Sequence, residues 1–149
     1  MGCTRIAAVA LAAATLAASG CGSSSKPLTR AELTAKADTI CKTVTAKLAS
    51  KTIKSQQDIA RIAPELAGFE QAALADLGKL VPPAELEGDW KRFVAGAQTL
   101  AENTAKLGEY ARSNNLKAAK GLILSSVAVQ KQMVATAKRD GLKDCEQVA

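Results

Sequence analysis

The sequence predicts an all-α protein, an up-down-up-down four-helix bundle that follows an N-terminal signal segment and a short disordered tether. Two observations carry this prediction. The 149 residues include 4 prolines and 10 glycines, whereas the strong helix formers alanine, leucine and lysine are abundant. Apolar residues also recur at spacings of three and four over four stretches that turn signals separate. No internal repeat or second domain is visible in the sequence, so residues 29–149 are expected to form one helical domain.

The first predicted helix begins after Thr29 and ends near Leu48 or Lys51. Thr29 and Glu32 have the spacing of a capping box. One apolar stripe follows, made of Leu33, Ala37, Ile40, Cys41, Val44 and Leu48. Because this stripe is expected to face the core, Cys41 should be buried with it.

The second predicted helix begins at the capping residue Ser55 and has Asp58 in its first turn, where a negative charge is favourable. Its apolar stripe consists of Ile59, Ile62, Leu66, Phe69, Ala73, Leu77 and Leu80. Pro64 interrupts the pattern, because proline removes a backbone donor and its ring clashes with the preceding turn. We therefore expect helix 2 to be kinked or broken between Ile62 and Pro64.

The third predicted helix begins after the proline pair at 82–83, since proline suits a first-turn position. Its long inward face contains Trp90 and Phe93, which are either core residues or the wall of a ligand pocket. Gly96 and Gly108 lie within the same helix, where each costs about 1 kcal/mol relative to alanine. These glycines either permit a neighbouring helix to approach closely or are simply tolerated.

The fourth predicted helix is capped by Asn114 or Asn115. Its apolar stripe is Leu116, Ala119, Leu122, Ile123, Ser126, Val127, Gln130, Met133, Val134 and Ala137. Gly141 and Leu142 are typical of a helix C-terminus where a glycine in the left-handed backbone conformation ends the helix and the next residue makes a hydrophobic contact. Short links between the four helices indicate that consecutive helices are antiparallel.

The first 20 residues have the order of an export signal: Arg5, then an apolar run of about 13 residues, then small residues before Cys21. The run is shorter than the roughly 18 to 20 residues that a membrane-spanning helix needs. The end of this segment, Leu16-Ala17-Ala18-Ser19-Gly20-Cys21, resembles the lipobox of bacterial lipoproteins. A plain secretory signal that is cleaved after Gly20 is the alternative.

The lipobox resemblance implies a lipid anchor on Cys21. In such proteins residues 1–20 are removed, the Cys21 sulfur carries a diacylglyceryl group, and the new amine is usually acylated. The protein would then be lipid-anchored on the outer, extracytoplasmic face of the cell membrane. Residues 21–28, rich in glycine and serine, would form the flexible tether.

Two cysteines remain for a disulfide once Cys3 leaves with the signal and Cys21 is lipidated. An exported domain matures where disulfides form, so we expect Cys41 and Cys145 to pair. The closed loop of about 100 residues would stabilise the fold by roughly 4 to 5 kcal/mol. Two buried free thiols, or a redox-active pair, are the alternatives.

The segments around these two cysteines, residues 37–41 and 141–145, also resemble a loose family of small bacterial lipoproteins. The resemblance implies an architecture and a location, and it implies no activity. It covers the whole domain that follows Cys21.

The composition argues against several classes of function. The chain has no histidine and no Cys-x-x-Cys, so the commonest general base, metal ligand and haem ligand are missing. We expect no catalytic residues, no metal and no cofactor, and hence a protein that is not an enzyme. A net charge of +6 is modest, so no nucleic-acid partner is expected either.

One group of basic residues is a candidate site. In the predicted bundle, basic side chains gather at the pole farthest from the lipid, and we call them the basic tip: Lys47, Lys51, Lys54, Arg112, Lys117 and Lys120. The basic tip would attract an anionic envelope polymer or an acidic protein partner. The alternative is that these are ordinary solvated side chains.

The sequence therefore leaves two functions open for the lipid-anchored domain. The first is a non-enzymatic interaction or structural module that acts through its helix faces or its basic tip. The second is a binding protein for a small apolar or anionic ligand. An apolar ligand held between the helices requires a cavity of at least about 300 Å³, which we expect beside Trp90.

Overall fold

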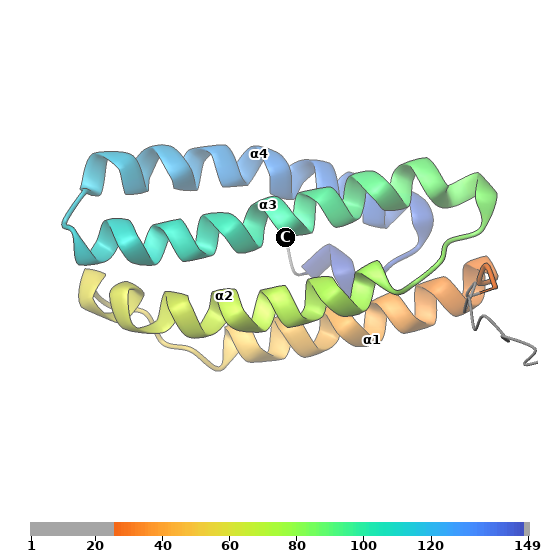
Figure 1. Ribbon diagram of the computed structural model, residues 1–149, viewed down its shortest axis with the longest axis horizontal. Helices are drawn as coiled ribbons and strands as arrows, with labels where there is room; N and C mark the ends of the chain where they lie inside the picture. The colour runs from red at the N-terminus through yellow and green to blue at the C-terminus, as the bar shows by residue number, and fades with distance from the viewer. Residues whose placement is uncertain (1–25, 148–149) are drawn as a thin grey trace, which may run out of the picture.

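Four antiparallel helices form the body of the protein (Figure 1). The computed structural model describes residues 26–147, and no strand occurs among them. The elements in chain order are α1 (Arg30–Ala49), α2 (Gln56–Gly78), the 3₁₀ turn η1 (Ala84–Leu86), α3 (Glu87–Arg112), α4 (Leu116–Asp140) and the 3₁₀ turn η2 (Cys145–Gln147). The predicted all-α four-helix bundle is therefore confirmed. The predicted signal segment, Cys21 and most of the predicted tether lie outside the described residues.

Side-chain caps fix where the helices begin. At α1 the Glu32 backbone N–H donates to Thr29 Oγ1 (3.3 Å), and the Thr29 N–H donates to the Glu32 carboxylate (2.8 Å). At α2 Ser55 and Asp58 form the same reciprocal pair. Asn115, one of the two candidates, caps α4 by accepting a hydrogen bond from the Ala118 N–H. These caps satisfy backbone donors that have no partner within the helix.

Pro64 lies inside α2, which continues unbroken from Gln56 to Gly78. Of the two outcomes that the sequence left open, the break is wrong. The neighbouring helix α3 lies close against this turn because Gly108 has no side chain: a Cβ there would stand 2.9 Å from Ala63 Cβ and 3.5 Å from Pro64 Cδ. Gly108 therefore permits a close helix approach, and packing holds the proline-containing turn in place.

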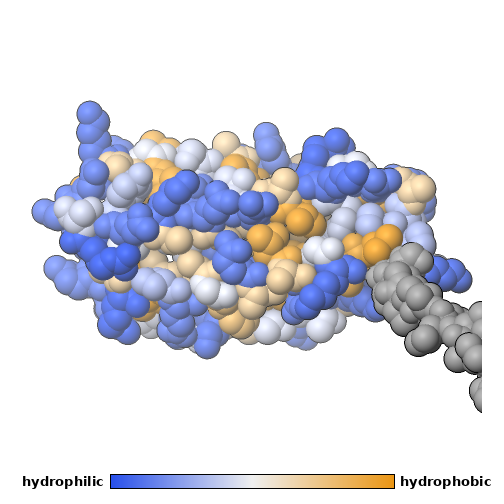
Figure 2. All heavy atoms as spheres, in the orientation of Figure 1, coloured by the Kyte–Doolittle hydropathy of each residue, from blue (hydrophilic) through white to orange (hydrophobic). Residues whose placement is uncertain are grey.

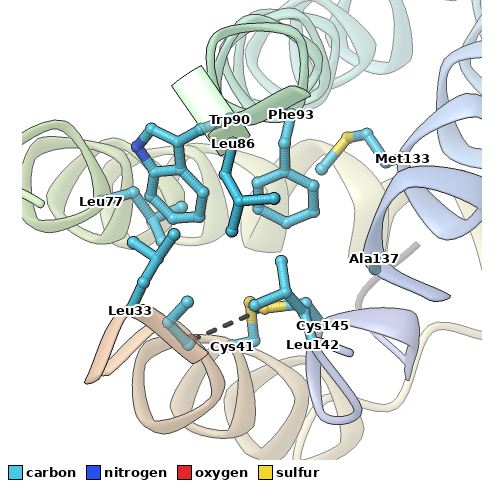
Figure 3. Close-up of a cluster of buried hydrophobic side chains, with 11 residues drawn as sticks. Leu33, Cys41, Leu77, Leu86, Trp90, Phe93, Met133, Ala137, Leu142 and Cys145 are labelled. Atoms are coloured by element: carbon cyan, nitrogen blue, oxygen red, sulfur yellow. Dashed lines mark hydrogen bonds between the residues drawn. A yellow bond between two sulfur atoms is a disulfide. The ribbon is translucent and has the colours of Figure 1, made fainter. Parts of the chain in front are cut away.

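The core lies at the end of the bundle where α4 turns back toward α1 (Figure 3). Leu142, fully buried after the left-handed Gly141 (φ 80°), packs beside the disulfide between Cys41 and Cys145, whose Cα atoms are 4.9 Å apart. The rings of Trp90 and Phe93 stack above them with centroids 5.7 Å apart. The cysteine pairing expected from the sequence is thus present, and it joins α1 to η2.

The bundle is closed at the disulfide and open elsewhere between α1 and α4. Helix α1 packs on α2, and α4 packs on α3, but α1 and α4 make almost no contact with each other. The turn η2 touches both of them and fills the space between them at one level. Beyond η2 the groove between α1 and α4 has no helix to cover it.

The contacts that hold the body together can be followed within residues 26–147. The buried core cluster and the disulfide join residues from Leu33 to Cys145, and Leu28 packs against the cluster. The Leu28 N–H donates to the Val81 carbonyl (2.9 Å), so the last residue of the expected tether contacts the segment that follows α2. None of the helices in this part of the chain has the length and apolar character needed to cross a membrane.

Candidate functional site

A cavity of about 330 Å³ lies among all four helices, next to the core cluster. Phe93 and Met133 separate it from the core, and Ile40 and Val44 of α1 form one wall. Ile123 and Val127, on the opposite wall, are 48 % and 40 % exposed. Because these two residues face both the cavity and solvent, they place its mouth on the α4 side of the open groove.

The exposure of the first half of α4 differs from the sequence prediction. Leu116, Ile123 and Val127 were expected on the inward face, but all three are exposed. The reason for Ile123 and Val127 is that α1 lies across the cavity and does not pack against α4, so these two residues line the cavity instead of a core, whereas Leu116 lies outside the cavity wall.

Some of the polar side chains in the cavity wall have hydrogen-bond partners. Asn103 Nδ2 donates to Ser126 Oγ (3.0 Å), and Thr104 Oγ1 donates to the Leu100 carbonyl (3.1 Å). Glu70 is different, because it is the only charged side chain in the wall. Glu70 Oε2 is buried and has no hydrogen-bond partner among residues 26–147.

Glu70 occupies a position where the fold calls for an apolar residue. It follows Leu66 by four positions and precedes Leu77 by seven, so it shares the inward stripe of α2. Burial raises the pKa of the Glu70 carboxyl, and the neighbouring Thr104 hydroxyl opposes this rise only in part. A buried carboxylate without a partner is costly. The sequence analysis missed Glu70, although a lone charge in an apolar stripe is a readable signal.

A second, more open hollow of about 610 Å³ lies beside Trp90, between the end of α2 and the start of α3. Figure 2 shows hydrophobic side chains gathered along this α2–α3 seam, on a face that is otherwise mostly hydrophilic. Trp90 itself is 5 % exposed and belongs to the core. A hollow of the predicted size therefore lies beside Trp90, and the less open cavity lies beside Phe93.

The residues of the basic tip have different surroundings in the structure. Lys47 and Lys51 both pair with Glu65, at 3.4 Å and 2.7 Å, because α1 ends short of the pole where α2 begins (Figure 1). Glu65 lies about 13 Å along α2 from its first residue, and the sequence analysis missed this partner. Arg112 Nη1 donates to the Ala60 carbonyl (3.3 Å).

The remaining basic-tip residues, Lys54, Lys117 and Lys120, are exposed. Lys54 lies beside Asp58, whose carboxylate accepts a hydrogen bond from the Lys54 backbone N–H (3.1 Å). The side chains of three of the six basic residues thus have partners among the described residues, and binding of an anionic partner by the basic tip stays a prediction.

The remaining site predictions concern lipidation and metal binding. Cys21 lies outside residues 26–147, so its lipidation stays a prediction. Within those residues no three His, Cys, Asp or Glu side chains come together in a way that could hold a metal ion. No protein-family model, curated protein or solved structure matches this chain.

Proposed function

We propose that this protein is a lipid-anchored, extracytoplasmic binding protein that holds a small apolar molecule in the cavity among its four helices. The observation that carries the proposal is the 330 Å³ cavity, which is lined mostly by apolar side chains and opens at Ile123 and Val127. Such a cavity lowers the stability of a small bundle. Binding of an apolar molecule would recover that stability.

The size of the cavity favours a small molecule over a protein partner. One turn of an α-helix about 10 Å wide and 5.4 Å long occupies about 420 Å³, which exceeds the 330 Å³ available. Pockets of about 300 Å³ and above are typical of small-ligand sites. Of the two functions that the sequence left open, this geometry favours ligand binding.

The proposed anchor supports the same function. Residues 21–28 reach at most roughly 25 Å, so lipid chains on Cys21 would hold the cavity close to the membrane surface. Two or three acyl chains on one residue give lasting attachment. A membrane is also where apolar molecules are concentrated.

Probe binding tests the cavity. The fragment 22–149, which includes all described residues, is titrated with the neutral fluorescent probe N-phenyl-1-naphthylamine. Ala73→Phe fills the cavity, since Ala73 lines it, whereas Ala72→Phe on the same helix is exposed and lines no part of it. We expect saturable fluorescence enhancement that Ala73→Phe abolishes and Ala72→Phe retains. Equal binding by both variants, or no binding by the parent, would contradict the proposal.

Intact mass tests the anchor. Protein from the native membrane should begin at Cys21 and carry the mass of the diacylglyceryl group, with or without a third acyl chain. A Cys21→Ser variant should not become acylated. A chain that begins at residue 21 without added mass, or that retains the leader, would remove the lipid anchor from the proposal.

A further inference from the structure

Glu70 gives the proposed cavity a chemical preference. Its carboxylate is the only charge on the cavity wall, and one of its oxygens is buried without a hydrogen-bond partner in the described part of the chain. Nearby, Asn103 donates to Ser126, and the Thr104 hydroxyl, which donates to the Leu100 carbonyl, lowers the raised pKa of Glu70 only in part. Neither arrangement supplies Glu70 with a positive charge.

A carboxylate with one unpartnered oxygen in an apolar wall is most favourable when a bound molecule brings the missing donor. A cationic donor is the best complement, because charge-assisted hydrogen bonds are about twice as strong as neutral ones. Lys47 and Lys51 of α1 pair with Glu65, and no lysine or arginine of the described residues lines the cavity. The charge that neutralises Glu70 is therefore expected to come from the ligand.

We infer that the ligand of this cavity is a single-chain aliphatic amine, with its ammonium group on Glu70 and its hydrocarbon chain against the apolar wall. The inference rests on the proposed function, because it names the class of molecule that the same cavity takes. Glu70 acts as the counter-charge that selects the head group. Phe93, Val44 and Ile123 contact the chain.

The volume of the cavity limits the length of the ligand's hydrocarbon chain. A cavity of about 150 Å³ accepts benzene, so 330 Å³ suits a molecule with about twice as many carbons. An amine with a chain of ten carbons meets this limit, whereas a two-chain lipid exceeds it. Decylammonium is therefore the appropriate probe.

The net positive charge of the protein makes a preference for an ammonium ligand informative about the site. The full chain carries a formal charge of +6, and fragment 22–149, which lacks Arg5, carries +5, so non-specific attraction favours anions over cations. A preference for an ammonium compound must then come from a local negative group inside the site. Decylammonium, decanol and decanoate share one chain and differ only in head group, which makes them a matched series.

The experiment measures how each of the three compounds displaces N-phenyl-1-naphthylamine from fragment 22–149. We expect decylammonium to bind about 10- to 100-fold more tightly than decanol, the range of one charge-assisted hydrogen bond. Glu70→Gln should remove this preference. Glu102→Gln, which changes an exposed glutamate outside the cavity, should retain it.

The outcomes separate this inference from the proposed function. If the three compounds displace the probe equally, or if decanol or decanoate is the tightest, the cavity binds apolar chains and the amine inference is overturned. If none of them displaces the probe and Ala73→Phe has no effect, the proposed function itself fails. The head-group series on the parent protein decides the question even where Glu70→Gln folds poorly, and circular dichroism checks that variant.

Discussion

Arg112 Nη1 lies 3.3 Å from the Ala60 carbonyl, the acceptor that Pro64 leaves without a donor inside α2. In a regular helix the N–H of residue 64 would bond to this carbonyl. The side chain of α3 thus replaces the missing backbone donor. Gln56 Nε2 donates to the Ala111 carbonyl (2.6 Å) on the same seam, so α2 and α3 exchange side-chain-to-backbone hydrogen bonds around the proline.

Arg112→Gln is expected to lower the free energy of unfolding by about 1 kcal/mol, because the Ala60 carbonyl loses its donor. Denaturant unfolding measures the change. In a Pro64→Ala background, the restored N–H of residue 64 serves this carbonyl, so the same substitution should cost little. An equal loss in both backgrounds would show that Arg112 acts by another route.

Gly108→Ala should destabilise the protein by about 1 to 3 kcal/mol, the usual cost of forcing extra volume into a packed site. The new Cβ would stand 2.9 Å from Ala63 Cβ, and neither backbone can move away easily. Gly68→Ala is the matched control, because nothing lies within 4 Å of its added Cβ. It should stabilise α2 by up to about 1 kcal/mol. Thermal unfolding of both variants checks the contrast, and a stable Gly108→Ala would rule out the close approach.

Cys41→Ala combined with Cys145→Ala should lower the free energy of unfolding by about 4 kcal/mol, because the disulfide closes a loop across 104 residues. The turn η2 contacts both α1 and α4, which otherwise barely meet. Loss of the crosslink should therefore speed hydrogen exchange in α1 and α4 more than in α2 and α3. Uniform acceleration over all four helices would contradict the view that η2 joins the two outer helices.

The sequence predicts the helices better than it predicts how they pack. Capping residues such as Thr29 and Ser55 act locally, so helix starts can be read from spacing alone. The unbroken course of α2 through Pro64 depends on Gly108 and Arg112, more than 40 residues away, and no local pattern reveals it. The open groove between α1 and α4 is also not predictable from local patterns. The stripe of α4 is apolar at Ile123 and Val127, but an apolar stripe does not specify which neighbouring helix covers it.

The candidate site was harder to predict for a related reason. The sequence does not predict that Lys47 and Lys51 pair with Glu65, because this contact depends on α1 ending short of the bundle pole. Glu70 is not predicted as a site residue because one charged residue does not change the helical spacing of the apolar stripe. Its importance depends on the cavity around it, which exists because α1 and α4 do not meet.

Glu70→Gln should stabilise the unliganded protein at pH 7.5, and the gain should shrink as the pH falls toward 4. The pKa of the Glu70 carboxyl is raised in the folded state by burial. At low pH the carboxyl is protonated in both the folded and unfolded chains, so its ionisation costs the folded state nothing. As the pH rises above its ordinary pKa, the unfolded chain ionises freely while the folded chain keeps the proton or bears a buried charge, and stability is lost.

Among residues 26–147 no other titratable side chain faces Glu70 across the cavity, since the wall residues of α1, α3 and α4 are apolar or neutral and Cys41 is in the disulfide. The pH dependence of the difference between parent and variant therefore reports on this one group. Thermal unfolding from pH 4 to pH 8 measures it, with Glu102→Gln as the exposed control that should show no such trend. A gain that is constant over this range would mean that Glu70 ionises as freely in the cavity as in water, and that the cavity wall does not hold it in an apolar environment.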